Sequence, residues 1–230
     1  MRNPHLLKRI RTSPLPREFV YFDCETTPEG ISLVETRLKF RLAVAVYSVY
    51  RKGKSEPVEQ WSNFNDSLEM WTWISAKVHE RTALYVVAHN AEFDFRVSKG
   101  FSALVSLGWE IKRFFLDGNK FTVWWQNGRK SIIVLDSLQL LPVGIAALGQ
   151  MLGLPKSKMP SYDEPDSVWF PYCRRDVEVL SLAMHTYREF VGANDFGGMA
   201  KTTAGQAFRA FRHRFMREDV EIHNNEEALK

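Results

Sequence analysis

The sequence predicts an α/β protein in which helices flank a mixed central sheet. Apolar, β-favouring runs alternate with helical patterns along most of the 230 residues. The turn signals DGN and NG also separate three consecutive strand-like runs, which indicates β-hairpins inserted among the βα units. We therefore divide the chain into a basic arm (1–17), a compact core (18–190) and a C-terminal extension with a helix and a polar tail (191–230).

The elements expected in the first half of the core follow from apolar alternation and from turn residues. They are strands at 18–26 and 37–53, a short strand near 56–61, a helix at 66–82 and a buried strand at 83–89. An Asn or Asp residue is expected to cap the helix.

A helix at 90–108, closed by Gly108, opens the second half of the core. Three strands follow at 109–116, 120–126 and 130–137, separated by the two turn signals. After them we expect a helix near 143–152, a Pro- and Ser-rich loop at 153–171 and a core helix at 171–190. Pro171 suits the first helical position of that last helix. In the extension, 202–215 has apolar side chains near one face, so we expect it to pack on the core, with a docking surface as the alternative.

Composition indicates where in the cell the protein acts and what kind of molecule it binds. Two cysteines, Cys24 and Cys173, are too few for a disulfide framework, and the N-terminus has no apolar core typical of a secretory signal, so an intracellular setting is expected. The net charge is +4, and basic residues gather in the arm, in 99–130 and in 201–217. This pattern favours an acidic polymer over a small substrate, although solvated basic faces also explain such clusters.

The first strand carries two acids one residue apart, Asp23 and Glu25. Side chains at i and i+2 share a face of a strand, roughly 6–7 Å apart along the chain. Two carboxylates this close repel, so such a pair is solvated, shares a proton or holds a cation.

Two further motifs place acids at ends of elements. Asp94 lies in AHNAEFDF, where a buried strand runs into a helix with Asn90 as its expected cap. Tyr172 and Asp176 are spaced i, i+4, so they project from one helix face. Each has a structural alternative when taken alone: a first-turn acid favoured by the helix dipole, a packing tyrosine and a solvated helix acid.

Taken in order, the three motifs resemble those of the four-acid 3′→5′ exonucleases with a ribonuclease H-like fold. Asp23-Cys24-Glu25 matches the first motif, Asn90 to Asp94 the second and Tyr172 to Asp176 the third. The segments DSLQLLPVGIAALGQMLGL and AKTTAGQAFRAF narrow the resemblance to the proofreading domain of protein-primed family B DNA polymerases, found in certain phages and linear plasmids. The resemblance covers nearly the whole chain.

The resemblance implies hydrolysis of phosphodiester bonds at the 3′ end of single-stranded or frayed DNA. Two divalent ions, Mg²⁺ or Mn²⁺, would be held by Asp23, Glu25, Asp94 and Asp176, while Tyr172 orients the attacking water. Oxygen ligands suit magnesium, and the motifs offer carboxylates rather than a cage of thiols or imidazoles.

The resemblance also implies residues that hold the frayed DNA end; these are Thr26, Asn90, Phe93, Ser137 and Leu138. Phe93 would stack on a base, and one of Lys156 and Lys158 would neutralise the scissile phosphate. Local roles are equally open for Thr26 as a turn hydroxyl, Phe93 as core and Ser137 as a cap. We interpret Asp136, at the end of a strand, as structural, and the two cysteines as non-catalytic.

The chain departs from the family because the polymerase motifs D-x-x-S-L-Y-P and Y-x-D-T-D are absent. The resemblance therefore implies a free-standing nuclease or part of a polymerase, and in the second case a polymerase domain or subunit is the expected partner. A phage- or plasmid-encoded protein of this kind would act inside the host cell. Two other functions remain open: a 3′→5′ exoribonuclease, which would use the same acids, and a non-catalytic module for binding single-stranded nucleic acid.

Overall fold

The computed structural model describes residues 5–30, 36–54, 56–118 and 120–222. The chain forms two compact units: Pro16–His185 is one, and Met1–Leu15 with Thr186–Lys230 is the other. In the described residues, no helix is long and apolar enough to cross a membrane.

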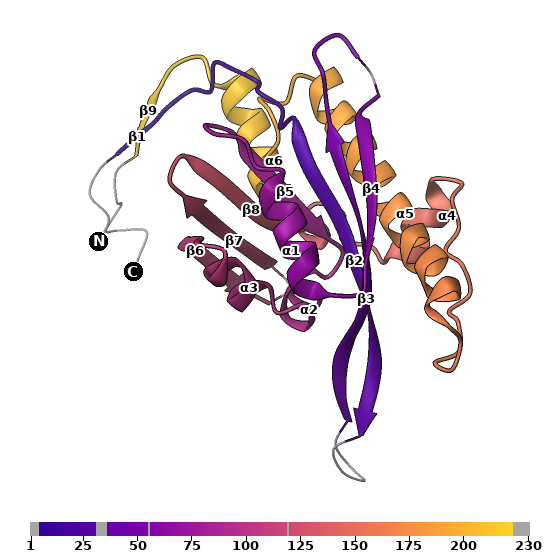
Figure 1. Cartoon of the computed structure of the whole chain (residues 1–230). Coiled ribbons are helices and arrows are strands. Elements are labelled where there is room, and N and C mark those ends of the chain that lie inside the picture. The colour runs from indigo at the N-terminus through magenta and orange to yellow at the C-terminus, as the bar shows by residue number, and fades with distance from the viewer. Residues whose placement is uncertain (1–4, 31–35, 55, 119, 223–230) are drawn as a thin grey trace, which may run out of the picture. The chain divides into compact units, whose positions relative to one another are not determined.

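The larger unit is built on a seven-stranded sheet in the order β4-β3-β2-β5-β8-β7-β6 (Figure 1). Its strands are β2 (Glu18–Gly30), β3 (Thr36–Val49), β4 (Val58–Phe64), β5 (Ala83–Ala88), β6 (Glu110–Asp117), β7 (Lys120–Asn127) and β8 (Lys130–Asp136). β5 is parallel to both β2 and β8, and all other neighbours are antiparallel. The predicted mixed sheet and its hairpins are therefore confirmed.

Beyond Glu25, β2 and β3 continue as a two-stranded ribbon that projects from the sheet (Figure 1). The ladder shifts register between Glu25 and Thr26, and Thr26 then pairs with Phe40. A bulge of this kind bends the strand and increases its twist, so the ribbon leaves the sheet immediately after the two acids.

Among the described residues, five α-helices and a 3₁₀ turn complete the larger unit. They are α1 (Ser67–Ala76), α2 (Ala91–Val97), α3 (Gly100–Ser106), the turn η1 (Ser137–Gln139), α4 (Ile145–Met151) and α5 (Asp166–Ala193), whose last residues belong to the second unit. The single helix expected at 90–108 is wrong, because Lys99 takes a left-handed conformation with φ of 55° between α2 and α3. Gly100 follows, where a Cβ would lie 2.6 Å from the ring of Phe95, so only glycine fits without repacking.

Alternation along β2 separates the core from the acids. Val20, Phe22 and Cys24 are buried in one hydrophobic cluster with Trp71 of α1 and Phe95 of α2. The ring centroids of Phe22 and Trp71 are 5.6 Å apart. Since neighbouring residues of a strand face opposite ways, Asp23 and Glu25 lie on the other face, where α5 runs.

The start of α5 corrects a prediction: the helix begins at Asp166, and Pro171 lies inside it rather than at its first position. Proline removes one backbone hydrogen bond there, yet the preceding turn is held by other contacts. Arg41 Nε donates to Asp166 Oδ1 at 2.8 Å, and Asn65 Nδ2 donates to Asp166 Oδ2 at 2.9 Å. These bonds anchor the first turn ahead of the proline.

The smaller unit joins the two ends of the chain. β1 (His5–Leu7) pairs antiparallel with β9 (Val220–Ile222), and α6 (Thr203–Ala210) runs into a π-helical turn (Phe211–Phe215). Phe208, Phe211 and Phe215 are exposed within the described residues. The expectation that this apolar face packs on the core stays a prediction. The short strands β1 and β9 were not expected from the sequence.

Candidate active site

Parallel pairing brings the first two acidic motifs together. Tyr21 on β2 is in register with Val87 on β5, so the end of β5 and the start of α2 lie beside Asp23. The backbone N–H of Cys24 donates to Asp94 Oδ1 at 3.2 Å, which fixes the Asp94 carboxylate against β2. Two acids distant in sequence thus meet because the strands that carry them run in the same direction.

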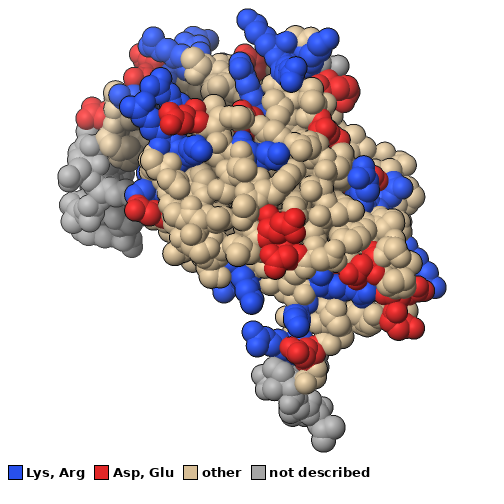
Figure 2. Space-filling model, viewed as in Figure 1, with Lys and Arg blue, Asp and Glu red and all other residues tan. Residues whose placement is uncertain are grey.

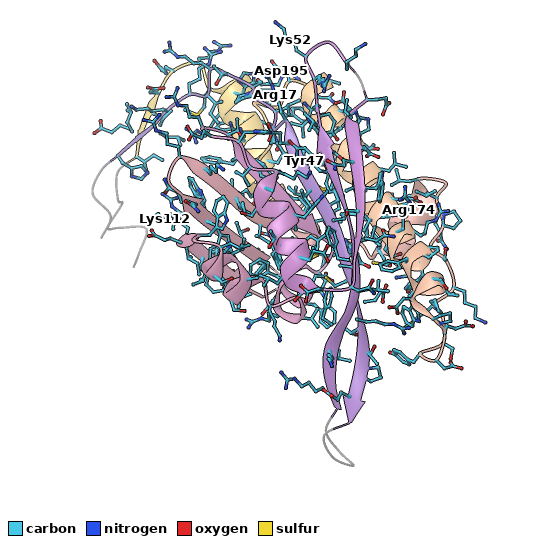
Figure 3. The ribbon with its side chains drawn as sticks, viewed as in Figure 1. Arg17, Tyr47, Lys52, Lys112, Arg174 and Asp195 are labelled. Atoms are coloured by element: carbon cyan, nitrogen blue, oxygen red, sulfur yellow. The ribbon has the colours of Figure 1, made fainter. Side chains whose placement is uncertain are left out.

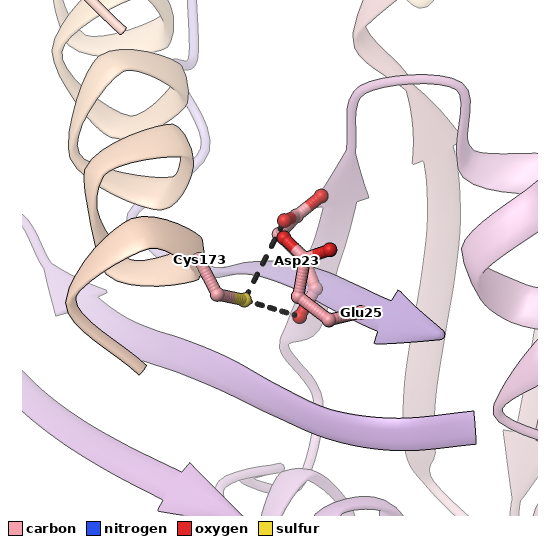
Figure 4. A group of neighbouring side chains, drawn as sticks. All are labelled: Asp23, Glu25 and Cys173. Carbon is pink, nitrogen blue, oxygen red and sulfur yellow. Dashed lines mark hydrogen bonds between the residues drawn. The ribbon is translucent and has the colours of Figure 1, made fainter. Parts of the chain in front are cut away.

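Helix α5 carries the third motif and contacts β2 at Asp23. Cys173 Sγ donates to the backbone oxygen of Asp23 at 3.3 Å and to its Oδ2 at 3.5 Å (Figure 4). Ligand atoms of Asp23, Glu25 and Cys173 all lie within 4.8 Å of one another. Burial raises the pKa of the Cys173 thiol well above its ordinary value, and so does the negative charge of Asp23, so the sulfur acts here as a protonated donor.

Burial raises the pKa values of all four carboxyl groups, and neighbouring carboxylates raise those of Asp23, Glu25 and Asp94 further. Burial and the charge of Asp176 raise the pKa of Asp23 to about 7, and burial and the charge of Asp23 raise that of Glu25 to about 8. Burial and Asp23 raise the pKa of Asp94 well above its ordinary value, and burial raises that of Asp176. Negative charge is therefore crowded here beyond what the protein itself neutralises.

The carboxylate of Asp176 is only partly neutralised by the protein, because only one of its two oxygens has a partner among the described residues. Lys156 Nζ lies 2.5 Å from Asp176 Oδ2 and 5.0 Å from the centroid of the Tyr172 ring. The other oxygen, Asp176 Oδ1, is buried without a hydrogen-bond partner in the described part of the chain. A buried polar atom without a partner costs about 1–3 kcal/mol, and more when the group is charged, so this oxygen marks a place for a further partner.

These observations fit a divalent cation. The donors are carboxylate oxygens, the ligands that Mg²⁺ and Mn²⁺ prefer, and added positive charge would lower the raised pKa values of Asp23 and Glu25. A cation would also give Asp176 Oδ1 the partner that it lacks. The carboxylates of Asp23 and Glu25, with Cys173 beside them, are thus a candidate metal-binding site.

Lys156 is brought to the acids by a close backbone contact. Leu154 N–H donates to the carbonyl oxygen of Gly149 at 2.8 Å, and this folds the loop after α4 back against the helix. A Cβ at Gly149 would lie 2.5 Å from the carbonyl oxygen of Leu154 and 3.4 Å from the backbone nitrogen of Lys156. The absence of a side chain at 149 therefore lets the loop pack closely enough to bring Lys156 to the acids.

Gly149→Ala is expected to destabilise the protein, although alanine favours a helix by about 1 kcal/mol over glycine. The clash with a backbone oxygen forces the loop to move, and overpacking of this kind typically costs about 1–3 kcal/mol. Thermal melting should show a lower Tm. Gly144→Ala is the control, because a Cβ at this N-cap position of α4 meets nothing within 4 Å. Equal or higher Tm in Gly149→Ala than in Gly144→Ala would contradict the expected clash.

The raised pKa values predict how the stability of the chelated protein depends on pH. Asp23 and Glu25 bind their protons more tightly folded, with pKa values of about 7 and 8, than unfolded, with ordinary values of 3.8 and 4.5. The folded state therefore holds more protons between pH 5 and pH 8, and the free energy of unfolding falls as the pH rises through this range. In chelator, Tm should fall from about pH 5 to pH 8.

Two comparisons isolate this effect. Asp23→Asn removes one of the titrating groups and should flatten the pH dependence of Tm in chelator. Millimolar Mg²⁺ should restore the wild-type Tm most strongly at the alkaline end, where the carboxylates are ionised. The opposite result would be a Tm that rises from pH 5 to pH 8 in chelator, with a larger rise in the wild type than in Asp23→Asn. It would show that the acids are not crowded in solution.

The candidate DNA-binding residues lie around this cluster with different exposures. Thr26 follows Glu25 at the bulge and is half-buried. Asn90 is exposed between β5 and α2, and Phe93 is exposed in the first turn of α2. Ser137 is fully buried, and Leu138 is half-buried. Of the two candidate lysines, only Lys156 contacts the acids, because Lys158 is exposed and forms no ion pair within the described ranges.

Asp136 has the structural role that we inferred for it, and it replaces Asn90 as the cap of α2. Asn90 is in the left-handed region and its side chain makes no capping bond, so that prediction is wrong. Instead, the N–H groups of Asn90 and Ala91 donate to the two oxygens of Asp136, at 3.1 and 3.0 Å. His89, which the motifs did not single out, also lies beside the candidate site, and its Nδ1 is 2.9 Å from Ser137 Oγ. Its position directly before Asn90 of the second motif could have pointed to it.

Comparison with known proteins identifies the fold. The sequence matches no protein-family model and no curated protein. Similar solved structures include phi29 DNA polymerase complexed with single-stranded DNA, with a TM-score of 0.52, and phi29 DNA polymerase complexed with primer-template DNA in a post-translocation binary complex, with a TM-score of 0.50. In both, 14% of the residues are identical, and the match covers 86% of this chain and 35% of the polymerase chain. The ribonuclease H-like α/β fold predicted from the sequence is thereby confirmed.

Proposed function

We propose that the chain is a metal-dependent 3′→5′ exodeoxyribonuclease that hydrolyses the terminal phosphodiester bonds of single-stranded or frayed DNA. The observation that carries the proposal is a group of buried carboxylates from three elements: Asp23 interacts with Asp94 of α2 and with Asp176 of α5, and one oxygen of Asp176 is buried without a partner in the described residues. The fold shared with a polymerase whose structure contains single-stranded DNA supports the choice of substrate. Such a nuclease would be free-standing or the proofreading part of a polymerase.

The carboxylates of Asp23, Glu25, Asp94 and Asp176 would hold two divalent ions, Mg²⁺ or Mn²⁺. When bound, these ions supply activation of water and stabilisation of the leaving 3′ oxygen. The Tyr172 hydroxyl would orient the attacking water.

The residues around the acids would hold the DNA end. The ammonium group of Lys156, already beside Asp176, would offset the charge of the scissile phosphate. Thr26 and Asn90 would donate hydrogen bonds to phosphate and sugar, and the exposed ring of Phe93 would stack on a base. Ser137 would orient His89 through the bond at Nδ1, and Leu138 would line the site beside it.

A time course on 5′-labelled oligonucleotides tests the proposal. With Mg²⁺, we expect stepwise shortening from the 3′ end of single-stranded DNA and slower shortening of duplex, since fraying a paired end costs a few kcal/mol. With excess chelator, no shortening is expected. Cleavage in chelator or cleavage that starts at the 5′ end would contradict the proposal, and faster cleavage of a matched RNA would reassign the enzyme as an exoribonuclease.

A further inference from the structure

A pocket of about 500 Å³ opens at the foot of the β2–β3 ribbon, outside the cluster of acids. Its walls come from the ribbon, from the start of α1 and from the junction of α2 with α3. Figure 2 shows Lys and Arg side chains gathered where the ribbon leaves the body of the protein. Nothing in the proposed cleavage chemistry uses this pocket.

The pocket is electropositive because its cations outnumber its acids. Four basic residues line it, namely Arg37, Lys39, Arg96 and Lys99, against two acids, Glu29 and Asp66. Asp66 Oδ1 already accepts the backbone N–H of Glu69 at 2.8 Å as the cap of α1. Among the basic residues, Arg96 pairs with Glu92 at 2.8 Å, whereas Arg37, Lys39 and Lys99 have no acidic partner in the described part of the chain.

The pocket shares two elements, β2 and α2, with three of the four acids. On β2, Glu29 is four residues beyond Glu25, a separation of about 13 Å along an extended strand. On α2, Arg96 is one turn beyond Phe93, and both side chains are exposed. A strand with its 3′ end at the acids and a base stacked on Phe93 would therefore reach Arg96 at the wall of the pocket. Leu38, Phe40 and Val97 supply apolar surface between the cations, which suits the faces of unstacked bases.

We propose that this pocket binds the phosphodiester backbone of single-stranded DNA a few nucleotides upstream of the 3′ end. The proposal rests on the proposed function for the direction of the strand. Its cations come from separate elements and line a cavity rather than a flat face, so they can contact successive phosphates of one chain. A basic groove with interspersed apolar and aromatic side chains is the usual solution for binding a single strand without sequence preference.

Fluorescence anisotropy with a 5′-fluorescein-labelled oligothymidylate of about 15 nucleotides, measured in chelator so that no cleavage occurs, tests the proposal. The variant is Arg37→Gln/Lys39→Gln/Lys99→Gln, in which all three side chains are exposed. The control is Lys52→Gln, because Lys52 is also exposed but follows the opposite end of β3 from Lys39 (Figure 3). Thermal melting checks that each variant is folded.

Each lost phosphate contact lowers the slope of log K against log salt by about 0.7, so the triple variant should lose about 2 from the slope and at least about tenfold in affinity at low salt. A trinucleotide too short to reach the pocket should bind wild type and triple variant equally. If the triple variant keeps the slope and the affinity of the wild type, the proposal for the pocket is overturned. If the wild-type protein still cleaves DNA in Mg²⁺, the proposed exonuclease function is unaffected by that result. Loss of binding in the triple variant, with no cleavage by wild type, would uphold the pocket and refute the exonuclease.

Discussion

Asp94→Asn should abolish 3′→5′ cleavage and at the same time raise the Tm of the chelated protein. The amide keeps the shape of the side chain and an oxygen that can accept the N–H of Cys24, but it removes a buried charge that burial and Asp23 already oppose. A catalytic metal supplies several kcal/mol of transition-state stabilisation, so weakening its binding should slow cleavage by about a thousandfold or more.

Single-turnover cleavage of a 5′-labelled single strand measures the first effect, and thermal melting in chelator at pH 8 measures the second. Asp117→Asn is the matched control, because Asp117 is an exposed acid on β6, away from the acid cluster. Unchanged cleavage by Asp94→Asn would remove Asp94 from the candidate site. A lower Tm in chelator would show that its charge supports the fold, contrary to its raised pKa.

Tyr172→Phe is expected to slow cleavage by about a hundredfold, the usual cost of a misplaced nucleophile, while the dependence on Mg²⁺ stays near normal. Phenylalanine retains the ring, which packs edge-on against Trp169 with centroids 5.9 Å apart, so the fold should be unaffected. Only the hydroxyl that would orient water is lost. Asp176→Asn, one turn along the same helix, should instead be inactive at any practical Mg²⁺ concentration.

The comparison of these two variants separates orientation from metal binding. Single-turnover rates are measured across a Mg²⁺ titration, with melting curves to show that both variants fold. If Tyr172→Phe cleaves at the wild-type rate, Tyr172 is a packing residue and the third motif reduces to Asp176. If Asp176→Asn recovers at high Mg²⁺, its carboxylate is not an essential ligand.

Local sequence patterns predicted most elements of the larger unit, because these elements depend on neighbouring residues in the sequence. Alternation along β2 and the DGN and NG turns before β7 and β8 gave strands that the structure confirms. Signals that depend on distant contacts failed. The start of α5 is fixed by Arg41 and Asn65, each about a hundred or more residues away in the chain, and no propensity of Pro171 reports such contacts.

The candidate site shows the same division. The ordered motifs predicted the four acids and Tyr172, and the structure brings these side chains together, while their roles stay predictions. The choice between Lys156 and Lys158 required the fold, because it depends on how the loop packs against Gly149. The cap of α2 likewise comes from Asp136 on another strand, and a local pattern at Asn90 had no access to it.

The pairing of β1 with β9 has a consequence for synthesis on the ribosome. The larger unit is one continuous stretch, Pro16–His185, whereas the smaller unit needs both Met1–Leu15 and Thr186–Lys230. Domains fold as units while the chain emerges at about 5–20 residues per second, so residues 5–7 wait roughly ten seconds or more for their partner strand. We therefore expect the acid cluster to be assembled on the nascent chain before the smaller unit closes.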